Sequence, residues 1–164
     1  MKKGIVFLFF IGLLISCSTN VETNDDPTIQ GLKDNVEWES YTVTGEVAGT
    51  TVTLTGVGSG TVKLKMKLPS GEVEQTDETT WIGYPLGTGT TNQAFYTVSI
   101  QGKEYTYRTA NKIGDGEFVV TNFDGETISG KFNFNAINTV TVEGIPSSVN
   151  FNKGIFYNIP LTYK

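Results

Sequence analysis

Apolar and polar residues alternate with a period of two along most of the chain after residue 33. In segments 61–68 and 127–136 every second residue is apolar or glycine, and the residues between are threonine, serine, asparagine or lysine. This alternation is typical of antiparallel strands that bury one face and leave the other in water. No helical period of 3.6 persists for more than a turn in this region, so the pattern predicts an all-β domain.

Short sequences rich in glycine separate the alternating segments and mark the turns between strands. The predicted strands are 36–45, 50–56, 60–68, 71–77, 79–84, 93–101, 103–109, 116–123, 126–136, 139–143 and 154–163. Links this short join neighbouring antiparallel strands, which predicts a sheet rich in meanders. We therefore predict one antiparallel domain over residues 33–164, a β-sandwich or a partly open barrel of about 8–11 strands without substantial helix.

The hairpin at Asp124-Gly125 yields a prediction about strand register. A strict two-residue turn there would set Ile128 opposite Thr121, so the apolar face of one strand would meet the polar residues of the other. A shift of one residue moves every side chain to the opposite face of the sheet. The hairpin therefore needs an odd-length loop or a bulge near residues 122–123.

The first seventeen residues, MKKGIVFLFFIGLLISC, follow a different pattern. Two lysines precede an apolar run over residues 4–15, which is shorter than the roughly 20 residues that a membrane-spanning helix needs. A basic start and a short apolar run predict a signal peptide over residues 1–16. The run ends in Leu14, Ile15, Ser16 and Cys17, which resembles the lipobox of bacterial lipoproteins.

The lipobox resemblance implies that the Cys17 thiol receives a diacylglycerol and that signal peptidase II cuts between Ser16 and Cys17. The new amino group would then carry a further acyl chain such as palmitate, and two or more chains hold a protein stably at a membrane. The polar, acidic segment that follows predicts a lipidated cysteine and a flexible tether over residues 17–32. Because Ser18 is not acidic, the resemblance favours the outer membrane and leaves its periplasmic or cell-surface face open.

The C-terminal half carries a second resemblance. Segments 116–124, 128–136 and 149–160 are similar to a family of small, uncharacterised β-rich lipoproteins of Flavobacteria and other Bacteroidetes. In that family a Thr-x-Phe-Asp strand end precedes an Ile-Ser-Gly-x-Phe-x-Phe strand and a terminal Gly-x-Phe strand. The resemblance implies a location at a membrane and a β-rich fold, but it implies no activity and no site residues.

Composition excludes several functions. A formal charge of −5 and a pI of about 4.7 give no electrostatic footprint for nucleic acid. The absence of histidine removes histidine-based triads and imidazole metal sites, and Cys17 is the only cysteine. We therefore expect no cofactor, no metal, no catalytic residue and no enzyme activity, although polysaccharide cleavage by two paired carboxylates stays as an alternative. The carboxylates considered are Glu72, Glu74, Asp77, Glu78, Asp115, Glu117, Asp124 and Glu126.

Trp81 and Tyr84 are the candidate ligand-binding residues. They lie in segment 81–91, which breaks the alternation and is expected to be a long loop. Aromatic side chains in such loops stack on sugar rings, line the mouth of an apolar pocket or anchor the loop to the sheet. Trp38 is expected in the core. Three lysines alternate along segment 61–68 and indicate either a contact with an anionic polymer or a solvated strand face that protects a sheet edge.

These observations favour a non-catalytic domain, tethered to a membrane through Cys17, that contacts a glycan or a protein. The first alternative is a barrel that carries a small apolar ligand such as a lipid, and the second is an enzyme acting on polysaccharide. An enclosed cavity lined by Phe132, Phe134 and tyrosines would favour the carrier. A solid core with an exposed surface at Trp81 and Tyr84 would favour contact, and two carboxylates about 5–10 Å apart in a cleft would favour the enzyme.

Overall fold

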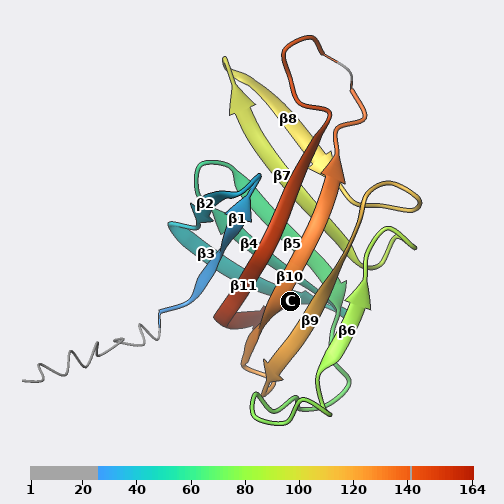
Figure 1. Cartoon of the computed structure of the whole chain (residues 1–164). Coiled ribbons are helices and arrows are strands. Elements are labelled where there is room, and N and C mark those ends of the chain that lie inside the picture. Colours follow the sequence, from blue (N-terminus) through green and yellow to red (C-terminus); the bar gives the residue numbers. More distant parts are fainter. Residues whose placement is uncertain (1–25, 141) are drawn as a thin grey trace, which may run out of the picture.

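The computed structural model describes residues 26–140 and 142–164. The predicted signal peptide, the lipobox with Cys17 and residues 17–25 of the predicted tether lie outside the described residues. Regular structure in the described chain consists of eleven strands (Figure 1). Their bounds are Thr28–Lys33 (β1), Val36–Glu39 (β2), Thr42–Ala48 (β3), Thr51–Val57 (β4), Thr61–Lys67 (β5), Ile82–Pro85 (β6), Gln93–Ile100 (β7), Lys103–Arg108 (β8), Asp115–Phe123 (β9), Thr127–Ile137 (β10) and Ser148–Tyr163 (β11). Within the described ranges no helix is long and apolar enough to cross a membrane.

All the strands belong to one sheet in the order β2-β1-β11-β3-β4-β5-β7-β8-β10-β9-β6. β10 also pairs with β11, so the sheet closes on itself. Two joints of this circuit are narrow: one residue pair, Ile137 with Arg108, links β10 to β8, and three parallel pairs link β11 to β3. The sheet therefore forms two layers, β2-β1-β11-β10-β9-β6 and β3-β4-β5-β7-β8, which cross each other in Figure 1. This arrangement confirms the predicted all-β fold.

The longest strand, β11, takes part in both layers because it bends twice. Lys153 and Asn158 both have a φ of 49°. The register of β11 against β10 shifts at each of these places, and its register against β1 shifts at the first. Bulges of this kind bend a strand and increase its twist. They let β11 leave β10 and run beside β3.

The hairpin of β9 and β10 contains the bulge that the alternation predicted. Phe123 pairs with Ile128 and Val120 pairs with Gly130, so Thr121 is an extra residue on β9. Val120 and Thr121 are consecutive buried residues, which marks the place where the alternation slips. The slip keeps the apolar side chains of both strands on the core side of the sheet.

The N-terminal boundary of the domain differs from the prediction. Residues 28–32, expected in the tether, belong to β1. Ile29 of this strand is fully buried, and β1 pairs with β2 on one side and β11 on the other. Segment 36–45, expected as one strand, is interrupted at Ser40 and Tyr41 because β2 pairs with β1 whereas β3 pairs with β4.

Two predicted strands, 71–77 and 139–143, are connections in the parts that the structure describes. In the first, only Val73 forms a bridge, to Phe123, while the Glu74 amide donates to the Thr80 hydroxyl and the Asp77 amide donates to the Glu74 carbonyl. Among the described residues of the second, the Val140 amide donates to Asn138 Oδ1 and the Val142 carbonyl accepts the Ile145 amide. Apart from the Val73 bridge, these backbone groups are therefore used in turns.

Aromatic rings fill the core between the two layers. The Phe151 ring lies at the centre, with its centroid 4.8 Å from that of Phe134, 5.4 Å from Tyr96, 5.8 Å from Trp38 and 6.3 Å from Phe132. All five side chains are buried. Trp38 is therefore a core residue, as predicted. The rings of Phe132 and Phe134 stack on each other, with their centroids 5.9 Å apart.

Candidate binding surface

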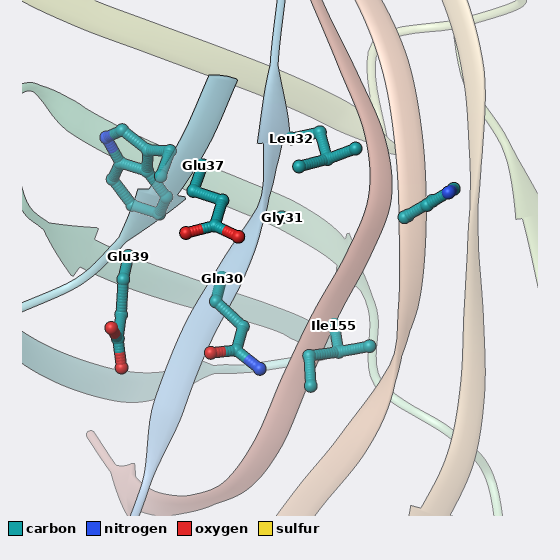
Figure 2. A pocket seen from close by; sticks show the side chains of 8 residues that line it. Gln30, Gly31, Leu32, Glu37, Glu39 and Ile155 are labelled. Carbon is teal, nitrogen blue, oxygen red and sulfur yellow. The ribbon is translucent and has the colours of Figure 1, made fainter. Parts of the chain in front are cut away.

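The outer face of the β2-β1-β11-β10-β9-β6 layer carries two adjoining hollows on either side of β11. The larger, about 650 Å³, lies over β1 and β2, and the smaller, about 260 Å³, lies over β9 and β10. Both are lined by Lys153 and Ile155, so they form one surface feature, which we call the β11 groove. Figure 2 shows the larger hollow, with Gln30, Glu37 and Glu39 on one side and Ile155 on the other. Its lining consists of Gln30, Gly31, Leu32, Glu37, Trp38, Glu39, Lys153 and Ile155.

Strand register sets the groove residues in a row across the layer. Gln30 of β1 pairs with Glu39 of β2 and with Ile155 of β11. Ile155 pairs in turn with Lys131 of β10, and Lys131 with Val119 of β9. Because side chains alternate along each strand, directly paired residues project from the same face. The row therefore combines a half-buried apolar floor with polar groups at intervals.

Two glycines allow β1 and β11 to approach closely beneath the groove. A Cβ on Gly31 would lie 2.9 Å from the Cα of Gly154, and a Cβ on Gly154 would lie 2.5 Å from the Phe132 ring. A side chain at either position would push strand or ring aside. The neighbouring bulge at Lys153 leaves that side chain exposed, where both hollows meet.

A chain of side-chain hydrogen bonds runs beside the groove across three strands. The Asn152 amide donates to Asn150 Oδ1 at 3.0 Å, and the Asn150 amide donates to Asn135 Oδ1 at 2.6 Å. The Asn135 amide donates to Asp115 Oδ1 at 2.6 Å. Each amide keeps further donor or acceptor capacity for a partner outside the protein. The strands hold these planar polar groups in fixed positions.

Asp34 adds an ionised carboxylate next to this chain. Its carboxylate accepts a hydrogen bond from Lys33 Nζ at 2.6 Å and one from the Asn150 backbone amide at 2.9 Å. Burial alone would raise the pKa of Asp34, but these hydrogen bonds and the charge of Lys33 outweigh it and lower the pKa below its ordinary value. Asp34 is therefore negatively charged at neutral pH and ties the β1–β2 turn to β11.

The structure separates the two aromatic residues predicted to bind a ligand. Tyr84 belongs to β6, pairs with Phe118 of β9 and is 8% exposed, so it faces the core, and burial raises its pKa. The expected long loop 81–91 therefore begins with a strand. Trp81 is half-buried and packs against the core, and the centroid of its ring lies 4.8 Å from Lys131 Nζ. The expected exposed Trp81 and Tyr84 surface does not form, and Trp81 meets the groove only through Lys131.

Three of the acidic candidates accept hydrogen bonds within the protein. Asp124 accepts the backbone amides of Glu126 at 2.8 Å and Thr127 at 2.6 Å, and the Thr127 hydroxyl at 3.0 Å. Hydrogen bonds from the Thr127 and Glu126 amides hold the pKa of Asp124 below its ordinary value. Asp77 is bound in the same way by the Thr79 hydroxyl and amide, which lower its pKa. Asp115 is the acceptor of Asn135 described above.

The described residues contain no cluster of three or more histidine, cysteine, aspartate or glutamate side chains that could hold a metal ion. Glu72, Glu74, Glu78, Glu117 and Glu126 are exposed.

Comparison with known families gives one match. The family described as Domain of unknown function (DUF6252) matches residues 25–160. The chain belongs to this family. The matched range begins just before β1 and ends within β11, so it includes residues of every strand of the DUF6252 domain. No curated protein and no solved structure matches the chain.

Sequence reasoning missed most of the groove in the DUF6252 domain. Gln30 and Leu32 fell in the predicted tether, and nothing local indicates that β1 pairs with β11, since Gln30 and Ile155 are far apart in the chain. One signal was available in segment 149–159. Buried residues there are spaced by two, then three, then two and then three, which indicates the bulges at Lys153 and Asn158.

Proposed function

We propose that this chain is an exported lipoprotein, held at a membrane by lipid on Cys17. In this proposal its DUF6252 domain is a non-catalytic module that contacts a glycan or a protein through the β11 groove. One observation carries the contact role: a hollow lined by polar side chains lies outside a core packed with aromatic rings. The groups available to a partner are therefore on the outer surface.

The chemistry of the groove suits a partner rich in hydroxyl or peptide groups. Glu37 and Glu39 offer hydrogen-bond acceptors, Lys153 offers donors, and Gln30 offers both. Leu32 and Ile155 provide half-buried apolar surface between them. Binding sites of this kind combine an apolar floor with a few oriented polar groups. Because all these residues lie on or directly beside paired strands, a partner would order their side chains and not their backbone.

The position of β1 limits the reach of the anchor. Ten residues, 18–27, separate Cys17 from the first residue of β1. Ten residues span at most about 35 Å even when fully extended. The proposed anchor would therefore keep the groove, whose first residue is Gln30, within a short distance of the lipid headgroups.

Replacing Cys17 with alanine tests the anchor. Cells that express the wild-type chain should incorporate labelled fatty acid into it, and the mature protein should begin at Cys17. The Cys17→Ala variant should carry no label and should accumulate as an unprocessed precursor. Label on that variant, or a mature wild-type chain that begins at another residue, would refute the anchor.

A matched pair of variants tests the groove. The full-length lipoprotein, in a neutral detergent, is screened by thermal shift against neutral oligosaccharides and peptidoglycan-derived and protein fragments, because a ligand of the folded state raises the melting temperature. The double variant Glu37→Gln and Glu39→Gln should lose the shift. Its control, Glu72→Gln and Glu74→Gln, changes an identically spaced exposed pair elsewhere and should keep it. Equal loss in both variants would contradict binding in the groove.

A further inference from the structure

The opposite layer carries a cluster of unpaired positive charge. Lys63, Lys65 and Lys67 of β5 and Arg108 of β8 lie on the outer side of the β3-β4-β5-β7-β8 layer, which we call the basic face. Within the described ranges the ion pairs are Lys33 with Asp34 and Lys164 with Glu46, and none includes these four cations. Side chains two residues apart on a strand are separated by roughly 7 Å, so the three lysines repel one another.

The position of β5 excludes edge protection as the reason for Lys63 and Lys65. Exposed lysines commonly blunt the free edge of a sheet. Here β5 pairs with β4 over its whole length and with β7 from Thr61 to Lys65, so it is an interior strand. The whole chain has 12 basic and 17 acidic residues, which makes a basic surface unexpected by composition. The strands of this layer carry two carboxylates: Glu46 is bound by Lys164 at 2.9 Å, and Glu104 of β8 belongs to neither of the ion pairs of the described residues.

An aromatic residue stands between two of these cations. Phe95 of β7 pairs with Lys63 on one side and with Arg108 on the other. Its neighbours Ala94 and Tyr96 are buried, so Phe95 projects outward, and it is half-buried without belonging to the core cluster. The outer face of this layer therefore carries an apolar ring whose two strand partners are both cations.

A row of hydroxyl groups lies directly beside Phe95. Thr61, Thr97 and Thr106 pair across β5, β7 and β8, and the hydroxyls of Thr97 and Thr106 are 3.0 Å apart. These residues, with Phe95, Lys63 and Glu104, line a hollow of about 400 Å³. The ring, the Lys63 ammonium group, the threonine hydroxyls and the Glu104 carboxylate therefore line one depression of the surface, and Arg108 lies beside it as the other strand partner of Phe95.

We propose that the basic face binds an acidic polysaccharide, a chain of pyranose rings that carry carboxylate or sulfate groups. The Phe95 ring offers an apolar platform for the carbon face of a sugar. Lys63 and Arg108 lie on either side for its anionic substituents, and arginine holds carboxylate or sulfate through two parallel hydrogen bonds. The threonine row meets the sugar hydroxyls. A simple anion or a lipid headgroup would contact the cations but neither the Phe95 ring nor the threonine hydroxyls.

Titration calorimetry on the full-length lipoprotein in a neutral detergent tests this inference. The probes are an octamer of galacturonate, a sulfated oligosaccharide and, as the uncharged reference, maltooctaose. At least one acidic probe should bind at least about tenfold more tightly than maltooctaose, and its affinity should fall as salt screens the charges. The double variant Lys63→Gln and Arg108→Gln should weaken that binding by about tenfold or more.

Two further variants separate a built site from net charge. Lys103→Gln with Lys112→Gln removes the same charge from exposed positions elsewhere and should change affinity by less than about twofold. Phe95→Leu should weaken binding by about fivefold while the salt dependence stays the same, because the ring carries no charge.

Three results would overturn the proposal: neither acidic probe binds better than maltooctaose, the control pair loses as much as the Lys63 and Arg108 pair, or only phosphatidylglycerol added to the micelles binds. None of them bears on the groove, which involves other residues.

Discussion

Replacing Phe151 with alanine removes the ring through which the aromatic side chains of both layers meet. Trp38 comes from β2, Phe132 and Phe134 from β10, and Tyr96 from β7, and each lies within 6.3 Å of the Phe151 centroid. Phe151 itself is 0% exposed. Surrounding side chains are held by strands that cannot close in, so the substitution leaves a cavity at the centre of the core.

The expected cost follows from these contacts. A buried phenylalanine replaced by alanine costs about 3–5 kcal/mol in typical cores. Each aromatic pair adds about 0.5–1.5 kcal/mol beyond area burial, although four pairs that share one ring do not add fully. We therefore expect the free energy of unfolding to fall by about 4–5 kcal/mol, close to the upper end of the range. At roughly 3–4 °C per kcal/mol for a domain of this size, the melting temperature falls by roughly 12–20 °C.

Equilibrium unfolding in urea, followed by tryptophan fluorescence, measures this loss. Trp38 contacts Phe151 directly and reports the loss of core packing. The control is Phe95→Ala, which removes the same side chain from the outer face of a strand and should cost less than about 1.5 kcal/mol. The m-value should stay unchanged in both variants. A loss below about 2 kcal/mol for Phe151→Ala, or equal losses in the two variants, would refute a core centred on Phe151.

The same urea assay checks two further predictions. Asp124→Ala should cost about 1 kcal/mol at pH 7, since it removes three hydrogen bonds in an exposed turn where solvent weakens them. Because the folded-state pKa of Asp124 is lowered, this contribution is complete above the unfolded-state pKa and is lost as the pH falls through the folded-state value. The difference in the free energy of unfolding between the wild type and Asp124→Ala should therefore disappear in acid. A difference that does not change with pH would contradict this role of the Asp124 carboxylate. Gly154→Ala should lower the free energy of unfolding by about 1–3 kcal/mol, because the new methyl group would overlap the Phe132 ring. Gly89→Ala is the control, since a methyl group there meets open space and should cause no such loss. Similar losses in the two variants would contradict the close approach of Gly154 to Phe132.

Period-two alternation predicted most strands because it reports a local property, which side of a strand is buried. It also predicted an odd-length loop or a bulge near residues 122–123, because the apolar faces of two neighbouring strands had to agree, and the structure has a bulge at the adjacent Thr121. The sequence did not predict β1 because Ile29 is the one buried residue of that strand, which is too few to form an alternating pattern. The strand forms through its pairing with β11, at the other end of the chain. Local pattern contains no information about such distant pairing.

For the candidate surfaces too, the sequence shows the local pattern but not which strands lie side by side. The sequence shows a lysine stripe on β5, but only the strand order shows that β5 is an interior strand. Likewise the sequence predicted Tyr84 to bind a ligand from a loop, but Tyr84 pairs with Phe118 of β9 and its side chain faces the core. Both outcomes depend on which strands are neighbours, and the sequence leaves that open when hairpins and long connections alternate.

The packed core also bears on how the two proposed surfaces work together. The β11 groove presents Glu37 and Glu39, and the basic face presents Lys63 and Arg108, on opposite layers of one sheet. Between them lie the packed aromatic rings of the core, which we expect to keep one arrangement. Allosteric coupling requires an element with two states. Binding at one surface should therefore leave affinity at the other unchanged, within the roughly 0.3–0.5 kcal/mol typical of independent sites. If both proposals hold, the domain would keep two partners of different charge at a fixed separation without transmitting a signal between them.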